Sequence, residues 1–327
     1  MFFFPSLVLI FFPWFPESPY FLLKHKNDKD GALNALLRLY GPSNRQLAEM
    51  QVAKMESALQ STEALNHSEN RFNYIQLFKG KNLQRTIVAF TAPASQVLSG
   101  IIFVVGYLPY FLTLVGFDEV FNWNMYLFTI SLSANLFSFW TVERVGRRKV
   151  TIYGLFILMV VMFIIGGLNV QPSQPKYMAT IGLIYVWAAV FQLSIGPLGY
   201  TLASEVATAS LRAETQAVVT VSNALFGWTF SFSVPYMINP DAGNLGGKVG
   251  FLFGGLGLFC TLLGFFLFPE TKGMTFAEID WAYLNDIKPW RFSEAIAEQR
   301  LAERAGNGFS KRTSRDGAVH VEDGRKL

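Results

Sequence analysis

"TVERVGRRKV", residues 141–150, places one acid and four bases within seven positions. The charged residues are Glu143, Arg144, Arg147, Arg148 and Lys149. Residues 120–142 before this cluster and residues 150–175 after it contain no Asp, Glu, Lys or Arg. The cluster therefore separates two uncharged stretches, each long enough to cross a bilayer as a helix.

The whole chain follows the same pattern. Of its 327 residues, 51% are hydrophobic and 15% are charged, whereas about 25% of the residues of a soluble domain are charged. The uncharged runs are residues 86–117, 120–142, 150–175, 177–204, 215–240 and 249–269. One such run is compatible with a buried core helix, but six in succession predict an all-α, polytopic membrane protein.

The loops between these runs indicate the orientation, because cytoplasmic loops collect Lys and Arg. The 143–149 loop carries four bases, the 116–121 loop carries two acids and no base, and the 169–177 and 239–248 loops carry one base each. We therefore expect the 143–149 loop to be cytoplasmic. Six spans then place the segment before the first span and the tail from residue 270 on the same side, and we expect the plasma membrane.

The sequence predicts four parts. Residues 1–14, "MFFFPSLVLIFFPW", are apolar but too short to span; we expect a truncated transmembrane helix, since a signal peptide would have a basic start and a small-residue cleavage site. Residues 15–84 are a cytoplasmic helical linker and residues 85–269 a six-helix bundle. Residues 270–327 are a cytoplasmic tail, whose polar composition predicts disorder after about residue 305.

Local signals place three helices outside the bundle. Apolar side chains recur with helical spacing at Leu33, Leu36, Leu37 and Tyr40. Gly41 and Pro42 then end that helix, and Ser43 is a candidate cap for a second amphipathic helix. In the tail, Thr275 and Glu278 have the spacing of a capping box, which predicts a short helix through "FAEIDWAYL".

Two spans combine helix breakers with polar residues. The first contains "APASQVLSG" and the fourth contains "FQLSIGPLGY", so they occupy matching places in successive triplets of spans. In transporters built from inverted repeats, broken helices at matching positions point to the substrate site. Such segments are expected to face protein or water, because lipid cannot satisfy freed backbone groups.

The polar side chains within the spans are neutral. They are Gln96, Ser99, Ser131, Asn135, Gln192 and Asn223, with aromatic residues such as Tyr107, Tyr200 and Trp228 nearby in the sequence. Amides and aromatic rings suit an uncharged polyol. The alternative is that these groups only hydrogen-bond between helices; we favour the ligand for Gln96 and Gln192, each at a broken helix.

Other chemistry has little support. The middle of each span lacks Asp, Glu, Lys, Arg and His, so the segment offers no obvious group for a proton relay. With one cysteine, Cys260, and three scattered histidines, there is no disulfide framework and no metal-ligand spacing. We expect no catalytic residues, no metal, no cofactor and no nucleic-acid partner.

The charged loop belongs to a set of motifs. "PESPYFLL" (16–23), "ERVGRR" (143–148), "GPLGYTLASEVATASLRAET" (196–215) and "PETKGMTFAEID" (269–280) occur in this order. This order resembles the sugar porter family of the major facilitator superfamily, over most of residues 1–285. Tyr200 and "SLRAET" are more similar to fungal α-glucoside and related transporters than to animal glucose facilitators.

The resemblance implies a sugar site. Gln96 matches the first glutamine of the seventh-helix motif of that family, whereas Val97 and Ile102 replace polar residues of the pattern. Gln192 and Asn223 match polar positions of the tenth and eleventh helices, and Tyr200 stands where a tryptophan is usual. With Ser131, these residues are the candidate substrate contacts, and the departures leave the identity of the sugar open.

The resemblance also implies a cytoplasmic gate of ion pairs. Its acids are Glu17, Glu143, Glu205 and Glu270, and its bases are Arg144, Arg147, Arg148 and Arg212. In the family such pairs close the inner gate and break as the path opens inward. The alternative is a surface cluster that serves only topology.

Family members have about twelve spans, so this chain corresponds to the carboxyl-terminal half of a sugar transporter, with the bilayer, a sugar and a missing amino-terminal half as its partners. Three explanations for the short chain stay open: an incomplete gene product, a fragment inactive in transport, or a subunit that assembles with another chain. A membrane sugar sensor that does not transport is the alternative function, although a sensor is expected to carry a long structured tail. A membrane enzyme is disfavoured, because the spans contain no paired acids and no nucleophile with a base.

Overall fold

The computed structural model describes residues 6, 11, 12, 15–66, 73–117, 119–171, 173–208, 211–239 and 241–302. The chain forms two compact units, residues 1–72 and residues 73–327. The tail expected to be disordered after about residue 305 lies outside the described residues, as does most of the helix expected at residues 1–14.

The first unit is a small helical hairpin. Its elements are α2 (Pro19–Phe21), a π-helical turn (Leu22–Lys26), α3 (Lys29–Tyr40), a 3-10 turn (Pro42–Asn44) and α4 (Arg45–Asn66). Gly41, with φ of 88°, ends α3 as the sequence predicts. Ser43, the predicted cap of the second helix, lies instead within the preceding 3-10 turn. The second helix begins at Arg45. Leu22, Ala35 and Leu59 contribute to the small core between these elements.

The second unit contains the long apolar helices. A 3-10 segment (Asn73–Phe78) precedes α5 (Gly80–Leu98), α6 (Ile101–Val115), α7 (Val120–Val145), α8 (Arg147–Leu168), α9 (Gln174–Leu193), α10 (Ile195–Val206), α11 (Arg212–Ile238), α12 (Val249–Leu267) and α13 (Phe276–Leu284). Two 3-10 turns, Gly246–Lys248 and Pro289–Arg291, precede α12 and follow α13. Residues 292–302 form a further helical stretch.

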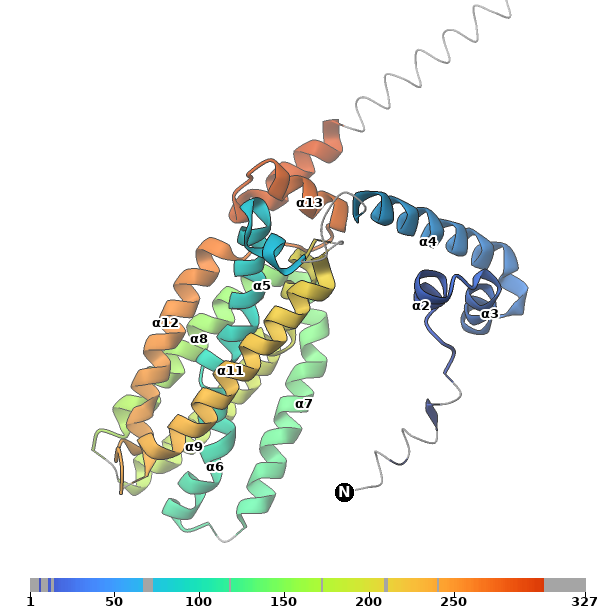
Figure 1. The fold of residues 1–327 in the computed structure, drawn as a ribbon. Helices are drawn as coiled ribbons and strands as arrows, with labels where there is room; N and C mark the ends of the chain where they lie inside the picture. The colour runs from blue at the N-terminus through green and yellow to red at the C-terminus, as the bar shows by residue number, and fades with distance from the viewer. Residues whose placement is uncertain are drawn as a thin grey trace, which may run out of the picture. The chain divides into compact units, whose positions relative to one another are not determined.

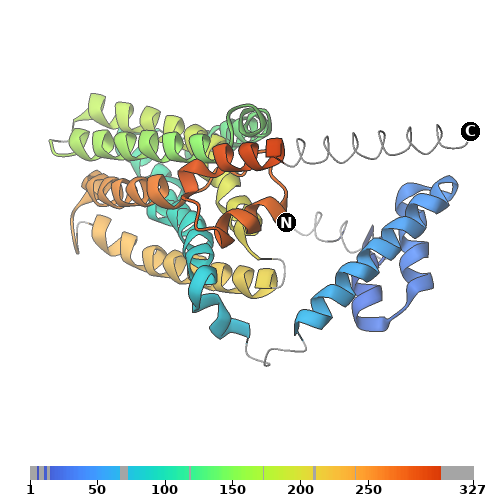
Figure 2. The same ribbon diagram turned by 90° about the horizontal axis from the view of Figure 1, so that it is seen from above.

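Six of these segments are long and apolar enough to cross a membrane, with α5–α6 and α9–α10 each counting as one interrupted span. This confirms the polytopic all-α fold expected from the uncharged runs. Figure 1 shows the spans packed side by side, with α13 beside the end of the bundle where α5 begins, and Figure 2 shows the same bundle from above.

The first span is the packing centre of the unit. Helix α5 contacts α10, α11 and α12, while α8 packs along α12 and α9. Small residues allow the tightest approach: a Cβ at Gly250 of α12 would lie 2.6 Å from the carbonyl oxygen of Met162 on α8. Close backbone contact through glycine is the usual way in which membrane helices associate, because lipid provides no hydrophobic drive between them.

The two interruptions do not fall at the prolines. Pro93 lies inside α5 and Pro197 lies inside α10, in its first turn, where a helix has no partner for that N–H anyway. The first break lies at Gly100, which has the left-handed φ of 103°. The second lies at Ser194, with φ of −122° and ψ of −102°. Breaks at matching spans are confirmed, and their positions are set by Gly100 and Ser194.

Candidate functional site

Gln96 joins the two interrupted spans. It lies near the end of α5, where it is 8% exposed. Its Nε2 donates to the backbone carbonyls of Ile195, at 3.0 Å, and Gly196, at 2.7 Å, in the first turn of α10. Gly199 makes the approach possible, because a Cβ there would lie 2.6 Å from Gln96 Nε2.

Gln192 lies on the other side of the break, in the last turn of α9. Its Oε1 accepts a hydrogen bond from Asn135 Nδ2 of α7 at 3.2 Å. The same oxygen would lie 2.9 Å from a Cβ at Gly196. Gln96 and Gln192 therefore approach the same residue, Gly196, one from α5 and one from α9.

The other candidate contacts divide into two groups. Asn223 of α11 donates to the carbonyl of Pro93 in α5 at 3.2 Å, so it also lies against an interrupted span. Ser131, one turn before Asn135 on α7, is half-buried. Tyr200 is 43% exposed on α10. Gln96, Gln192 and Asn223 are thus engaged by backbone or amide groups of this bundle, whereas Tyr200 presents its ring outward.

A charged network lies at the end of the bundle that includes the 143–149 loop. Arg147 Nη2 and Glu205 Oε1 are 3.5 Å apart, and both side chains are about one-fifth exposed. Thr271 Oγ1 donates to Glu205 Oε2 at 2.5 Å. The ion pair connects the start of α8 to the end of α10, and the Thr271 hydrogen bond connects the end of α10 to the segment after α12.

Glu270 caps α8. Its Oε1 accepts from the backbone N–H of Arg147 at 2.9 Å and of Lys272 at 3.1 Å. A carboxylate at a helix amino terminus is stabilised by the unpaired N–H groups and the helix dipole. Gly146 leaves the space, because a Cβ there would lie 2.5 Å from Glu270 Oε2, and its φ of 107° with ψ of 158° suits only glycine.

The remaining candidate gate residues have other contacts. Arg148 Nη2 donates to the carbonyl of Phe265 at 2.7 Å. Arg144 and Arg212 lie over the rings of Trp140 and Phe276, at 5.7 and 4.2 Å. Glu143 is exposed. Glu17 belongs to the first unit, where it accepts from the N–H of Ser18.

Arg85 is a buried cation that the sequence analysis did not select. It is 5% exposed in the second turn of α5. Its Nη1 forms an ion pair with Asp280 of α13 and donates to Thr208 Oγ1 at 3.0 Å, and its guanidinium lies 4.7 Å from the ring centre of Tyr283. Its position at the edge of an uncharged run was the only local signal, because Asp280 is 195 residues away.

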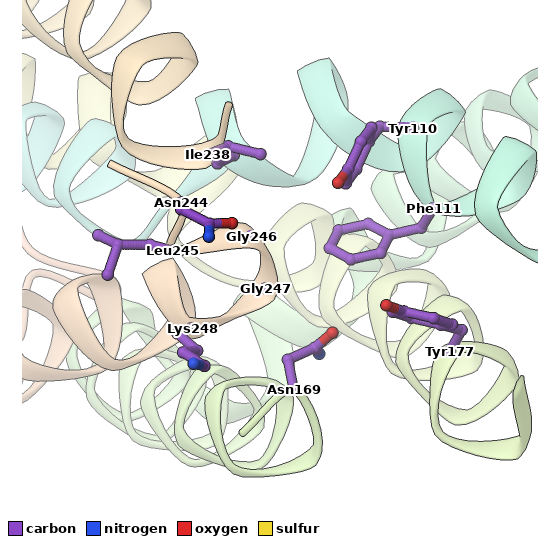
Figure 3. A pocket seen from close by; sticks show the side chains of 10 residues that line it. All are labelled: Tyr110, Phe111, Asn169, Tyr177, Ile238, Asn244, Leu245, Gly246, Gly247 and Lys248. Atoms are coloured by element: carbon purple, nitrogen blue, oxygen red, sulfur yellow. The ribbon is translucent and has the colours of Figure 1, made fainter. Parts of the chain in front are cut away.

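Among the described residues of the bundle, Gln96 and Gln192 line neither a small cavity at one end nor a wider groove on its side. The small cavity, of about 190 Å³, lies at the end opposite the 143–149 loop. Figure 3 shows Tyr110, Asn169, Tyr177 and Lys248 around it. The wider groove, of about 1020 Å³, runs between α8, α12 and the segment after α13.

The chemistry of the mid-span region is that of neutral hydrogen bonding. Amides such as Gln96 and Gln192 each offer donors and an acceptor, which matches vicinal hydroxyl groups. In the described parts of the spans, charged side chains lie only near the ends. The region is therefore suited to a polar, uncharged ligand.

A family-wide sequence profile described as "Sugar (and other) transporter" matches residues 1–283. The MFS transporter fmqE of Aspergillus fumigatus is 33% identical over 297 residues, which are 90% of this chain and 54% of that protein. The maltose permease MAL31 of Saccharomyces cerevisiae is 27% identical over 306 residues, 92% of this chain and 49% of that protein. The chain spans about half the length of these curated relatives.

Solved structures support the fold. The MFS proton:xylose symporter XylE, bound to 6-bromo-6-deoxy-D-glucose, aligns with a TM-score of 0.65 and 21% identity, over 85% of this chain and 56% of that chain. XylE from E. coli in an inward-open conformation aligns with a TM-score of 0.61 and 22% identity, over 84% and 54%. At 21% and 22% sequence identity, the similarity to XylE shows the fold alone.

Proposed function

Because the chain belongs to the sugar transporter family of the major facilitator superfamily, we propose that it supplies one six-helix bundle of a membrane transporter that moves a sugar by alternating access. The observation that carries the proposal is the meeting of two interrupted spans at Gly196, with Gln96 and Gln192 on either side. Interrupted helices at matching places of two repeats are where transporters of this kind bind substrate.

The side-chain amides recognise the hydroxyl groups of the sugar. A glutamine donates and accepts in one plane, so it can pair with two neighbouring hydroxyls of a pyranose. Gln96, Gln192 and Asn223 bind the sugar hydroxyls, Ser131 supplies a further hydroxyl, and Tyr200 packs its ring on the apolar face. Their present partners are neutral backbone and amide groups, and a sugar hydroxyl can replace these without a change of charge.

A second six-helix bundle completes the path. Only 11% and 17% of the most apolar stretches of α7 and α11 are buried within this chain, against 72% for α5–α6. Such surfaces must be covered by lipid or by another protein bundle. We assign part of this surface to a second bundle, because a sugar path needs a wall on both sides.

The names of two relatives support the proposed substrate class. Proteins named general alpha-glucoside permease and maltose permease are 26% and 27% identical to this chain. A mono- or disaccharide, such as an α-glucoside, is therefore the first substrate to test. The described mid-span residues include no ionisable carboxylate or amine, so this region offers no obvious group for proton coupling.

Uptake of labelled maltose and glucose by yeast lacking its own sugar permeases tests the proposal. The chain is expressed alone and as a joined protein, in which it follows the part of MAL31 that precedes the matching region. The joined protein is expected to restore uptake, and the chain alone is expected to give little, because one wall of the path is absent. Binding without uptake by the joined protein would instead indicate a sensor, and neither binding nor uptake would reject the function.

The orientation is tested separately. We expect the 143–149 loop and the residues after α13 to be cytoplasmic, because four bases lie in that loop and cytoplasmic loops collect bases. Cysteines introduced at Lys149 and Ser293 should resist a membrane-impermeant thiol reagent in intact cells and react after permeabilisation. A cysteine at Lys248, on the opposite end, should react in intact cells. The reverse pattern would overturn the orientation.

A further inference from the structure

The wide groove between α8 and α12 is lined by aromatic and apolar side chains along one part and by charged side chains at one end. Its walls are Ile152, Tyr153 and Phe156 of α8 and Thr261, Phe265 and Phe266 of α12. Phe156 and Thr261 lie furthest toward the middle of the spans, whereas Phe265 and Phe266 lie in the last turn of α12. Tyr153, Phe156, Phe265 and Phe266 are each more than half exposed. This part of the groove is an open, aromatic-rich channel on the outside of the bundle.

The other end of the groove carries charge. Arg148, Lys149 and Lys272 line it, together with Glu270, Glu294 and Trp290. Glu270 is already engaged as the cap of α8, and Lys288 lies 5.3 Å from the ring centre of Trp290. With three bases against two carboxylates, the lining of the groove mouth has a formal net charge of +1.

The two ends are separated by a distance that fits a lipid. Lys149 and Phe156 are seven residues apart on α8, which is about 10 Å along a helix. Trp290 lies at the charged end, and tryptophan is enriched at the level of lipid headgroups. The bases, with Phe265 beside Arg148, thus lie at headgroup depth, and Tyr153 and Phe156 extend the groove toward acyl-chain depth, on the side of the bundle that carries the 143–149 loop.

From this arrangement we propose that the α8–α12 groove binds an anionic phospholipid, with its phosphate and headgroup charge between Arg148, Lys149 and Lys272 and one acyl chain along Tyr153 and Phe156. A zwitterionic lipid fits the apolar wall but gains less from the bases. A soluble anion fits the bases but leaves the aromatic wall exposed. The site is separate from the mid-span amides and does not depend on the identity of the transported sugar.

Titration of the purified full chain with phosphatidylserine and with phosphatidylcholine of the same acyl chains, read by native mass spectrometry, tests the site. We expect tighter binding of phosphatidylserine. A lysine near anionic lipid contributes roughly a fivefold factor in affinity, so Lys149→Gln with Lys272→Gln should weaken phosphatidylserine binding about 25-fold and leave phosphatidylcholine binding unchanged. Gln at position 272 can still donate to the carbonyl of Arg144, which Lys272 contacts at 2.8 Å.

A matched control removes two bases from the opposite end of the bundle. Lys176→Gln with Lys248→Gln should leave the affinity for both lipids unchanged. If the double variant at the groove does not fold, Lys149→Gln alone suffices, because this side chain is exposed; a fivefold loss is expected.

Four results would overturn the proposal. Equal affinity for the two lipids, or an equal loss in the control variant, would show that the groove does not select an anionic lipid. Competition by glycerophosphoserine, which has the headgroup but no acyl chains, would indicate a site for soluble anions. Cross-linking from Tyr153→Cys to the residues after 302 would show that the chain itself covers the groove.

Discussion

The side-chain amide of Gln96 lies 2.7 Å from the carbonyl oxygen of Gly196, 100 residues further along the chain. This hydrogen bond joins the end of one interrupted helix to the beginning of another. The two spans are therefore connected at mid-membrane by a side chain that is also the first candidate for sugar recognition. A ligand that takes this amide as a partner would loosen the connection, which provides a physical link between binding and movement of α10.

Replacement of the amides should weaken sugar binding. In the joined protein, Gln96→Ala and Gln192→Ala each remove hydrogen bonds with a typical net worth of about 0.5–1.5 kcal/mol, so each should raise the dissociation constant several-fold. Equilibrium binding of labelled maltose measures this. Ser133→Ala, an exposed position on α7 whose hydroxyl bonds only within its own helix in this structure, is the control. Unchanged affinity in both glutamine variants would remove these residues from the site.

The Arg147–Glu205 pair should affect turnover more than binding. It lies at the ends of α8 and α10, away from the mid-span amides, so Arg147→Ala or Glu205→Ala should lower the maximal uptake rate of the joined protein while the dissociation constant for maltose stays within about twofold. Lys176→Ala, a base at the opposite end of the bundle, is the control. A normal rate at normal expression would restrict these charges to a topological role.

Arg85 should be important for the stability of the bundle end. Its removal leaves Asp280 without its partner. Because Asp280 is 35% exposed and water can solvate it, the cost should lie below the roughly 3–5 kcal/mol of a fully buried pair, at about 1–3 kcal/mol. Arg85→Ala should therefore lower the melting temperature in detergent. Lys81→Ala breaks an exposed pair with Asp286, at 2.8 Å, and should cost less than about 1 kcal/mol. Similar losses in the two variants would contradict a special role for Arg85.

Gly146 should be intolerant of any side chain. Its backbone conformation and the neighbouring Glu270 carboxylate leave no room for a Cβ, so Gly146→Ala should destabilise the bundle by about 1–3 kcal/mol. Gly167→Ala tests the same substitution in α8 at a site with no atom within 4 Å of the added Cβ. That variant should be neutral or slightly stabilised, since alanine favours helices. The melting temperatures of the two variants measure this difference, and equal melting temperatures would contradict the requirement for glycine at position 146.

The helix after the last span should loosen in acid. Hydrogen bonds from Arg300 lower the pKa of Glu278 from 4.5 to about 2. Because the folded-state pKa is depressed, the carboxylate contributes stability above about pH 4.5, and this contribution is lost as the pH falls toward 2. The difference in stability between the unmodified chain and Glu278→Gln should therefore narrow over this interval. Hydrogen exchange of residues 275–285 measures this difference in stability. A difference that does not change with pH would contradict the lowered pKa of Glu278.

Several features could be read from the sequence because they depend on neighbouring residues. The six spans follow from the lengths of the uncharged runs, and the turn at Gly41 follows from a helical repeat that ends in Gly-Pro. The capping box is another such feature: Thr275 Oγ1 accepts from the N–H of Glu278, and the Glu278 carboxylate accepts from that of Thr275. Each depends on groups a few residues apart, so local spacing is sufficient.

The position of the helix breaks needed the tertiary structure. The breakers in "APASQVLSG" and "FQLSIGPLGY" predicted the two interrupted spans, and the first stretch includes Gly100, where the break lies; Pro93 and Pro197 are both accommodated within helices. At the break in the fourth span, the buried Ser194 packs where Gly154 of α8 leaves space: a Cβ at Gly154 would lie only 2.2 Å from the Ser194 side chain. This contact with α8 is a tertiary feature that spacing along the chain does not reveal.

The sequence by itself determined that this chain is a bundle of six membrane spans with charged ends and neutral polar interiors. Apolar length, charge and motif order are properties of the linear chain. Only the tertiary structure decided which groups meet: Gln96 with Gly196, Glu270 with the start of α8, and Arg85 with Asp280. These pairs are about 100 to 195 residues apart. Gly199 and Gly146 leave the space for the first two, and the packing of the helices brings all three into hydrogen-bonding range.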